Sequence, residues 1–397
     1  MRTAEVTLGE LVGPRGLIGG PFGSSLGSKD YVEEGVPVIR GTNLGFGREL
    51  GGDFVYVSAN KVDTELSRNT AVPGDLIFTQ RGTLGQVALV PQHRDERYVI
   101  SQSQMRLRAH PKRALTDYLY FACSSPAFLR QVSDNAISTG VPHINLGILS
   151  RLTVPLPGVS EQRAIAEVLG ALDDKIAANT KLIDIAKDLA VLSLARYRPT
   201  VALGNVVKQH KATVNPSLMT ADEVAHFSLP AFDAGQTAEV TRPVDIKSSK
   251  FEIRQPSVLI SKLNPRFPRV WNVAEVPAIP GLASTEFLVL EPSHSSTTFL
   301  WAELLQPSFG ATLESKVAGT SGSHQRVRPA DLLETLVVDP REVEPELQVQ
   351  ITSVGLLAAQ SRAENESLAA TRVALLPQLM SGKLRVKEAQ TLVEELV

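Results

Sequence analysis

The 397-residue chain is poor in cysteine and has no long apolar run. Cys123 is its only cysteine, so no disulfide can form within the chain, and a reducing compartment is favoured. No stretch approaches the roughly 18 consecutive apolar residues that a membrane-spanning helix needs. The first residues also lack the apolar segment of a signal peptide. These absences predict a cytoplasmic protein.

The chain also lacks a strong charge of either sign, because its formal net charge is −2. This balance counts against a protein that coats nucleic acid indiscriminately, since such binding depends on lysine and arginine neutralising phosphates. It leaves open a protein that reads specific sequences with basic residues gathered on one face. Seven basic residues against two acidic ones lie between Arg242 and Asn272. A charge run is more often a solvated surface, so it is only a hint of a DNA-binding face.

Sequence motifs for catalysis and for cofactor binding are missing. The seven histidines lack the spacing of a metal site. No glycine-rich loop is followed by Lys-Ser/Thr, and no Gly-x-Ser-x-Gly elbow occurs. The Asn/Asp-Pro-Pro-aromatic tetrapeptide of base amino-methyltransferases is also missing. We therefore expect no catalytic residues, no metal and no cofactor in this chain.

What the chain does contain is an internal repeat, the signature of a duplicated architecture. Val6–Val12 returns as Val201–Val207, with an offset of 195 residues. Ile100–Met105 resembles Leu282–Phe287 at an offset of 182, and Asn179 with its next three residues matches the segment at Asn365 at an offset of 186. The drift of the offset is what loop insertions between two copies of one domain would produce.

Each half begins with a part that reads as α+β. Short β-branched runs bounded by glycine and proline predict strands over 36–40, 75–79, 86–90 and 257–261. The dense glycines between Gly13 and Gly27 predict turns and loops. One short helix is expected over 115–132, with its counterpart over 298–314.

Each half ends in a long helix whose apolar residues alternate in steps of four and three, which is typical of a coiled-coil seam. At about 1.5 Å per residue, 35 helical residues would span roughly 52 Å. Two such helices could pack antiparallel and hold the globular domains apart. Asn179 and Asn365 fall at equivalent seam positions, where a polar residue can fix the register; two exposed asparagines at the edge of an apolar face are an equal alternative. The residues predicted for this packing, or for docking a partner, are Ile165, Leu169, Leu172, Ile176, Asn179, Ile183, Leu347, Ile351, Val354, Asn365, Leu368, Leu375 and Leu379.

Several motifs in both halves resemble those of the specificity (S) subunits of Type I restriction-modification systems. One is the C-terminal string Leu375-Leu-Pro-Gln-Leu-Met-Ser-Gly-Lys-Leu384. Others are Gly74-Asp-Leu-Ile-Phe-Thr-Gln-Arg-Gly-Thr83, Ser138-Thr-Gly140 leading to Leu152-Thr-Val-Pro-Leu-Pro157, and Glu161-Gln-Arg-Ala-Ile-Ala166. The second half departs from the pattern, because Ser257-Val-Leu-Ile-Ser-Lys-Leu-Asn-Pro-Arg266 replaces the Gly-Asp-to-Arg-Gly-Thr segment.

The resemblance implies an α+β chain with two target-recognition domains separated by two long antiparallel coiled-coil helices, related as a pseudo-twofold repeat. The corresponding domains are residues 1–158 and 199–344, and the helical spacers are residues 159–198 and 345–397. Each domain would read one half of a split, asymmetric DNA sequence, and the helices would set the unread spacer.

The resemblance also implies the partners. The helices would dock two methylation (M) subunits, and restriction (R) subunits would join for cleavage. S-adenosylmethionine, ATP and Mg²⁺ would be bound only by those subunits, which would carry out all catalysis.

Polar loops are the candidates for DNA contact, because arginine or lysine suits guanine and asparagine or glutamine suits adenine. In the first domain the strand-end loop, an interrupted strand and the Gly-Val-Pro-His-Ile-Asn loop supply them. These candidates are Thr79, Gln80, Arg81, Thr83, Ser101, Gln102, Ser103, Thr139, His143 and Asn145. The alternative for the first loop is a solvated hairpin tip, and a lone histidine such as His143 is more often structural.

In the second domain, two segments are the candidates, and the second, Gly-Ser-His-Gln-Arg-Val-Arg, is the stronger. They are Lys262, Asn264, Arg266, Arg269, Ser323, His324, Gln325, Arg326 and Arg328. If Arg326 pairs with a base, its replacement by alanine should weaken binding by roughly 1–3 kcal/mol. Two other functions stay open: a repeat scaffold that binds no DNA, and, with less support, a nuclease with a dispersed active site.

Overall fold

The computed structural model describes residues 4–394 and 396, apart from Ser24, Phe46, His93, Thr139 and residues 317–324. The chain forms two compact units. The first unit comprises Met1–Ala178 and Asn365–Val397, and the second comprises Asn179–Glu364. No described helix is long and apolar enough to cross a membrane.

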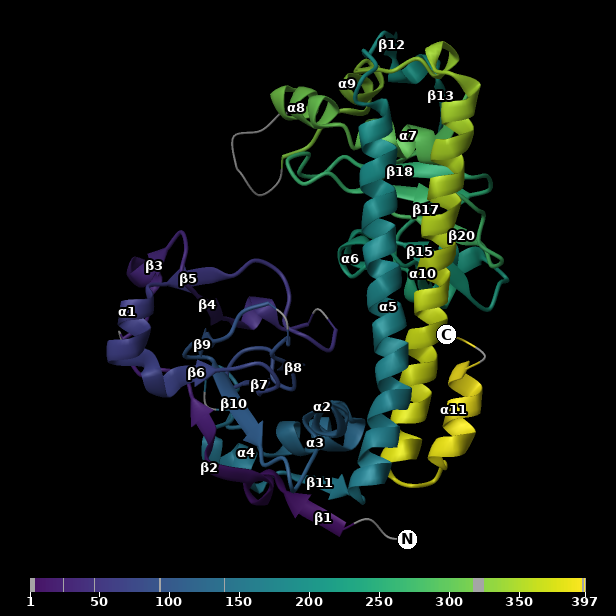
Figure 1. The fold of residues 1–397 in the computed structure, drawn as a ribbon. Coiled ribbons are helices and arrows are strands. Elements are labelled where there is room, and N and C mark those ends of the chain that lie inside the picture. The colour runs from purple at the N-terminus through teal and green to yellow at the C-terminus, as the bar shows by residue number, and fades with distance from the viewer. Residues whose placement is uncertain are drawn as a thin grey trace. The chain divides into compact units, whose positions relative to one another are not determined.

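The first unit contains three β-sheets with helices packed beside them, which makes it an α+β domain (Figure 1). Its antiparallel four-stranded sheet has the order β2 (Val12–Gly19), β10 (Gln104–Ala109), β7 (Leu76–Thr79) and β8 (Val87–Leu89). Its five-stranded sheet has the order β3 (Tyr31–Val32), β5 (Val55–Val57), β4 (Val36–Ile39), β9 (Tyr98–Ile100) and β6 (Thr70–Ala71). A third pairing joins β1 (Ala4–Thr7) to β11 (Thr153–Leu156).

The second unit repeats these sheets. Its four-stranded sheet has the order β13 (Val207–His210), β21 (Phe287–Pro292), β18 (Ser257–Ser261) and β19 (Val270–Val273). Its five-stranded sheet has the order β14 (Thr213–Val214), β17 (Lys250–Ile253), β20 (Gly281–Ala283), β15 (Val224–Phe227) and β16 (Glu239–Thr241). β12 (Val201–Ala202) pairs with β22 (Leu336–Val337).

The strand order confirms the predicted internal repeat. In each five-stranded sheet the single parallel pair, β4 with β9 or β15 with β20, lies between two antiparallel neighbours. The edge strands differ, because β3 extends the first sheet beyond β5 whereas β14 extends the second beyond β17. The four predicted strands are also present, as β4, β7, β8 and β18, with ends within one residue of those expected.

The prediction of turns and loops was wrong for Gly13, Gly16 and Gly19, which lie in β2. It was right for Gly20, Gly23 and Gly27, which lie outside strands and helices. The glycines of β2 belong to an irregular strand. The pairing of β2 with β10 shifts register between Leu107 and Ala109, and a Cβ on Gly16 would lie 3.0 Å from the Arg108 carbonyl oxygen. Glycine is therefore needed for close approach between backbones, a role that propensity alone does not distinguish from a turn.

The single helix expected over 115–132 is two helices, α2 (Thr116–Ser124) and α3 (Pro126–Asp134). Its counterpart over 298–314 is likewise divided into α7 (Thr297–Leu304) and α8 (Pro307–Ser315). Both breaks precede a proline, which forces the preceding residue out of the helical region. Ser125 has φ −69° and ψ 148°, and its side chain caps α3 by accepting from the Phe128 amide.

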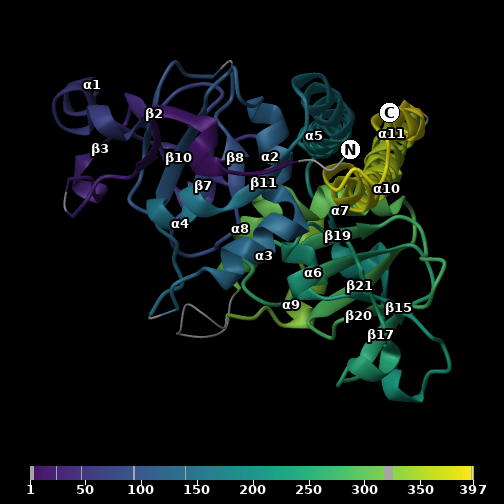
Figure 2. The same cartoon turned by 90° about the horizontal axis from the view of Figure 1, so that it is seen from below.

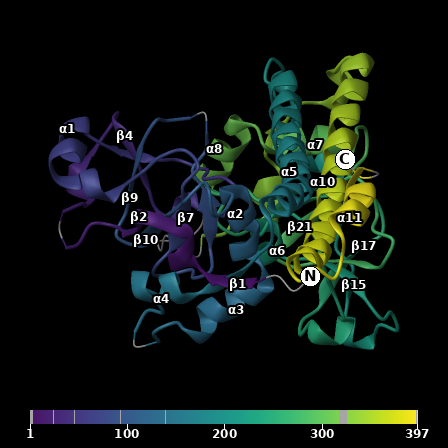
Figure 3. The ribbon, with the colours of Figure 1, turned by 60° about the horizontal axis from the view of Figure 1, so that its bottom comes forward.

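The core of the first unit lies between its four-stranded sheet and the long helices. Helix α2 stands between the sheet and α5 (Val159–Leu194) in both the side view and the view from below (Figures 1 and 2). Its Tyr118 and Phe121 are fully buried together with Met105 of β10 and Leu169 of α5. The five-stranded sheet and α1 (Ala59–Lys61) lie on the other side of the four-stranded sheet (Figure 3). Further short helices are α4 (Leu146–Arg151) and α11 (Val386–Glu394) in the first unit, and α6 (Leu229–Asp233) and α9 (Pro329–Leu333) in the second.

The two predicted long helices, α5 and α10 (Pro345–Met380), are present and pack against each other within each unit. In the first unit the Asn365 side chain donates to the Ile176 carbonyl oxygen at 3.3 Å, and Arg372 lies 2.7 Å from Asp173. Later residues of α10 thus meet earlier residues of α5, so the helices run antiparallel. In the second unit Asn179, only 6 % exposed, donates to Glu364 at 2.7 Å.

The residues predicted to pack between helices are all at least partly buried. Those that are buried are Ile165, Leu169, Leu172, Asn179, Ile351, Leu368, Leu375 and Leu379. Those of intermediate exposure are Ile176, Ile183, Leu347, Val354 and Asn365.

Helix α5 offers a matched test of this packing. Leu169 is fully buried, whereas Leu189 on the same helix is 51 % exposed. We expect Leu169→Ala to lower the free energy of unfolding by about 2–5 kcal/mol, because it leaves a cavity in the core. Leu189→Ala should change it by less than about 0.5 kcal/mol. Urea denaturation of both variants measures the difference, and equal losses would show that the helix packs otherwise.

Candidate nucleic-acid interface

Three of the predicted polar segments of the first unit meet at the end of its four-stranded sheet. Gln80 follows β7, and its amide donates to the Ser103 carbonyl oxygen at 2.7 Å, just before β10 begins. The Gln80 carbonyl oxygen accepts from the Ile144 amide at 2.9 Å, just before α4. A further bridge joins Arg81 to His143. Backbone pairing therefore brings together residues from three distant parts of the sequence.

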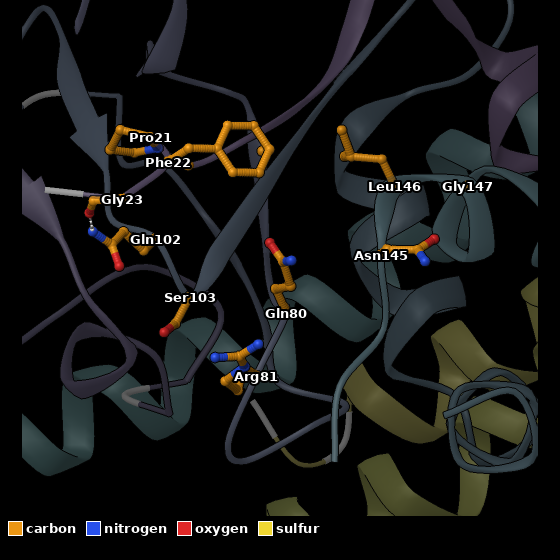
Figure 4. A pocket seen from close by; sticks show the side chains of 12 residues that line it. Pro21, Phe22, Gly23, Gln80, Arg81, Gln102, Ser103, Asn145, Leu146 and Gly147 are labelled. Carbon is orange, nitrogen blue, oxygen red and sulfur yellow. Dashed lines mark hydrogen bonds between the residues drawn. The ribbon is translucent and has the colours of Figure 1, made fainter. Parts of the chain in front are cut away.

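Two adjoining pockets open on this loop cluster, and Arg81, Gln102 and Ser103 line both. The first pocket, drawn in Figure 4, is walled by the predicted residues Gln80 and Asn145, by Leu146 and by the loop at residues 19–23. The second lies towards Thr83, Ser101 and the segment at residues 40–42. Among the residues that the structure describes, no carboxylate lines either pocket. A surface of amide, hydroxyl and guanidinium groups without acids suits a polyanion whose base edges offer donors and acceptors.

Close backbone contact holds this site together. A Cβ on Gly20 would lie 1.9 Å from the Ser101 carbonyl oxygen, so only glycine fits there. The Gly20 amide donates to Gln104 at 3.0 Å, and the Gln102 side chain donates to the Gly23 carbonyl oxygen. The loop at residues 20–23 is thus fixed against the turn that carries Gln102 and Ser103.

The predicted DNA-contact residues of the first unit differ in their solvent exposure and in whether they already have a partner within the protein. Arg81, Thr83, Gln102 and Asn145 are exposed, and no described carboxylate forms an ion pair with Arg81. Thr79 is only 3 % exposed, and its hydroxyl donates to Gln86 at 3.3 Å.

Several of the other candidates already have partners within the protein. Asn145 also caps α4, because its Oδ1 accepts from the Ile148 amide at 2.9 Å. The His143 ring lies 3.1 Å from the Val141 carbonyl oxygen. Ser101 bonds to Gln104. Thr139 lies outside the described residues.

The second unit contains an equivalent loop cluster. Lys262 follows β18, and its amide donates to the Glu286 carbonyl oxygen at 3.0 Å. The Lys262 carbonyl oxygen accepts from the Val327 amide at 3.0 Å, and Leu263 bridges to Arg326. These bonds repeat those of Gln80 at offsets of 182 to 183 residues. The two predicted segments of this unit therefore lie side by side, and the departure from the family motif leaves the backbone arrangement unchanged.

The arginines of the second cluster are mostly paired with acids. Arg269 makes a bidentate pair with Asp233 at 2.7 and 2.9 Å. Arg326 pairs with Glu286 at 2.8 Å, and Arg328 pairs with Asp331, whose pKa is lowered by that contact. The most exposed of these pairs, Arg326 with Glu286, contributes only about 0–1 kcal/mol, so an external anion can compete for Arg326.

The predicted basic run between Arg242 and Asn272 is not a uniform patch of free charge. Lys250 is 6 % exposed and donates to Ser248. Lys262 donates to the Thr285 carbonyl oxygen at 2.6 Å. Arg242 and Arg254, like Arg269, are paired with acids.

Arg266 has no ion pair with a described residue, and it lies over the exposed Phe267 ring at 5.9 Å. Asn264 adopts φ +50°, and its amide donates to Gln325 at 2.8 Å. Ser323 and His324 lie outside the described residues. Among the described residues, no group of three or more histidine, cysteine or acidic side chains could hold a metal ion.

Sequence reasoning missed one wall of the first pocket, formed by Gly19 to Gly23 and including Phe22. A phenylalanine between glycines that precede Ser25 was a usable signal, because an isolated aromatic in a glycine-rich segment has little to pack against. It also missed Arg40 and Thr42 in the second pocket. These follow β4, which pairs with β9 in the five-stranded sheet. The Ser101 amide, just after β9, donates to the Ile39 carbonyl oxygen at 2.9 Å, which brings the end of β4 close to the turn that leads into β10.

The family model described as "Type I restriction modification DNA specificity domain" matches residues 28–187. The chain is similar to two proteins of Methanocaldococcus jannaschii. The "Type I restriction enzyme MjaVIII specificity subunit" is 23 % identical over 155 residues, which are 38 % of this chain and 36 % of that protein. The MjaIX specificity subunit is 23 % identical over 183 residues, which are 44 % of this chain and 40 % of that protein. The chain thus spans about two fifths of the length of the curated relatives it matches.

A solved structure extends the likeness to nearly the whole chain at the level of fold. The crystal structure of the Type-I restriction-modification system S subunit from M. genitalium has a TM-score of 0.55 with this chain. The alignment of the two structures covers 95 % of each chain, at 17 % sequence identity. The arrangement of two sheet-containing domains and two long helices is therefore the fold of that S subunit.

Proposed function

We propose that this chain is the DNA sequence-recognition subunit of a Type I restriction-modification complex, because its residues 28–187 match the family model of the Type I restriction modification DNA specificity domain. Each unit binds one half of a bipartite, asymmetric target. The subunit itself is non-catalytic and binds no cofactor.

The observation that carries the proposal is the pair of equivalent loop clusters with unlike side chains. The same backbone bonds hold Gln80 in one unit and Lys262 in the other. Ser103 in the first cluster corresponds to Glu286 in the second, and His143 corresponds to Arg326. Because base edges are read by side chains, two clusters with one backbone and different side chains favour two different half-sites.

The long helices support the rest of the proposal. Each contributes residues to both units, so the helices set the length of the unread spacer between the half-sites. They also dock two methylation subunits, with restriction subunits joining the complex. S-adenosylmethionine, ATP and Mg²⁺ are then required by those partners alone.

A gel-shift assay against genomic fragments tests the proposal. The full-length chain is purified with and without a candidate methyltransferase partner from the same host, and an excess of unrelated competitor DNA is present. We expect a small set of fragments to be retained, because specific affinity commonly exceeds non-specific affinity by 10³ or more. Retention of no fragment would contradict the proposal and favour a scaffold. Cleavage or methylation by the chain alone, given Mg²⁺ and S-adenosylmethionine, would favour an enzyme.

A further inference from the structure

Phe22 is the most exposed of the large apolar side chains in the part of the chain that the structure describes, at 92 %. It stands in the loop between β2 and β3 and forms one wall of the pocket that Gln80, Arg81 and Asn145 also line. Figure 4 shows its ring at the rim of that pocket, with Leu146 across the opening.

The loop that carries Phe22 is fixed on both sides of the ring. On one side the Gly20 amide donates to Gln104, at a position where a Cβ would collide with the Ser101 carbonyl oxygen. On the other side the Gln102 side chain donates to the Gly23 carbonyl oxygen. The Phe22 carbonyl oxygen itself accepts from the Ser25 hydroxyl at 2.9 Å. The backbone on both sides of Phe22 is therefore held by hydrogen bonds, and it presents the exposed ring at the edge of the pocket.

We propose that Phe22 is a wedge that inserts beside a base pair of the first half-site and stacks on an unstacked base, while Gln80, Arg81 and Asn145 read neighbouring base edges. Apolar side chains that enter base steps kink the duplex, and the cost of unstacking is repaid by the contacts that the bend permits. This inference rests on the proposed function and adds to it a residue that reads DNA deformability.

Charge and surroundings favour a base over a protein as the partner of Phe22. The described lining of the pocket contains amide, guanidinium and hydroxyl groups and no carboxylate, which suits a polyanion. Apart from Phe22, the only large apolar side chain among the described lining residues, setting proline aside, is Leu146, which is of intermediate exposure. A protein interface would need a broader apolar core than this pair supplies.

Fluorescence of 2-aminopurine placed in turn at each position of the retained half-site tests the proposal. The full-length chain, with its methyltransferase partner where binding requires one, is compared with Phe22→Ala, Phe22→Trp and Phe267→Ala. Phe267 is the matched control, because it is 63 % exposed and belongs to the other loop cluster.

We expect the natural chain to raise the fluorescence at one position of the first half-site. Phe22→Ala should abolish that rise even at saturation and weaken binding about 10- to 100-fold, whereas Phe22→Trp should retain it. Phe267→Ala should leave the rise at that position unchanged. A mismatch at the same step should strengthen binding of the natural chain more than binding of Phe22→Ala. The reason is that a mismatched step needs less free energy to unstack, and only the chain with the wedge unstacks it.

Unchanged affinity and fluorescence in Phe22→Ala would overturn the wedge while leaving the proposed function intact. Loss of co-purification with the methyltransferase, with DNA binding preserved, would show that Phe22 contacts that protein and would also overturn it. Failure of the natural chain to retain any fragment would instead contradict the proposed function.

Discussion

Asp75→Asn is expected to lower the free energy of unfolding of the first unit by about 3–5 kcal/mol, because it removes the partner of a buried cation. Asp75 is 1 % exposed, and its carboxylate makes a bidentate pair with Arg108 at 2.7 Å. The same carboxylate lies 3.7 Å from Arg106, whose side chain is 5 % exposed. Burial lowers the pKa of Arg106, and Asp75 opposes that shift. Without Asp75, the guanidinium of Arg106 would remain buried with no counter-ion.

Asp63→Asn is the matched control for this prediction. Asp63 pairs with Arg97 at 2.6 Å, but it is 61 % exposed. Its loss should cost less than about 1 kcal/mol. Denaturant unfolding of the full-length chain, followed by circular dichroism, measures both variants. Equal destabilisation by the two substitutions would contradict the assignment of Asp75 as the central charge of a buried pair.

The second unit has the same fold without this ion pair, so the fold does not require the pair. By the repeat, Ser257 stands at the position of Asp75 and Val289 at that of Arg106. Val289 packs in an apolar cluster with Leu259. The Ser257 hydroxyl donates to the Gln255 carbonyl oxygen, so these two positions of the second unit form no ion pair. The same architecture thus forms without the pair, as expected when desolvation offsets most of the Coulomb attraction.

Arg81→Ala is expected to weaken binding to the retained DNA by about 1–3 kcal/mol, roughly 10- to 100-fold. Arg81 is exposed beside Gln102 and Ser103 in both pockets, and no described carboxylate competes for it. If it pairs with a guanine, the variant should also accept other bases at one position of the first half-site while the second half-site stays unchanged. Competition gel shifts with single-base variants of the target measure this.

Arg68→Ala removes the same charge from an exposed position of the same unit outside both pockets, and it serves as the control. It should change affinity far less than Arg81→Ala. An equal loss on all sequences, with a reduced dependence on salt, would show that Arg81 contacts a phosphate and no base. Unchanged binding would remove Arg81 from the interface.

Much of the fold followed from the sequence because its signals are periodic or repeated. The apolar steps of α5 and α10 and the return of Val6–Val12 as Val201–Val207 predicted the helices and the duplication. Where local signals conflict with tertiary contact, prediction failed. The glycines of β2 read as turns, yet they permit close backbone approach to β10. The helix breaks at Ser125 and before Pro307 follow from the proline positions, because a proline forces the residue before it out of the helical conformation.

For the candidate site, the sequence supplied the residues but not their neighbours. Gln80, Ser103 and Asn145 come from segments that only strand pairing brings together. The acids that pair with Arg269 and Arg326 are 36 and 40 residues away in the sequence, so the neutralisation of those arginines could not be read from the local charge run. The exposure of Phe22 and its place in the pocket could not be predicted either, because both depend on the folded structure.

The central claim is that two unlike loop clusters read the two halves of one DNA target. Methylome sequencing of the host, with and without the gene for this chain, tests it most directly. The account predicts that deletion removes methylation from one motif made of two different short blocks separated by a fixed number of unread bases. Deletion that removes no motif, or removes a continuous or palindromic one, would contradict it.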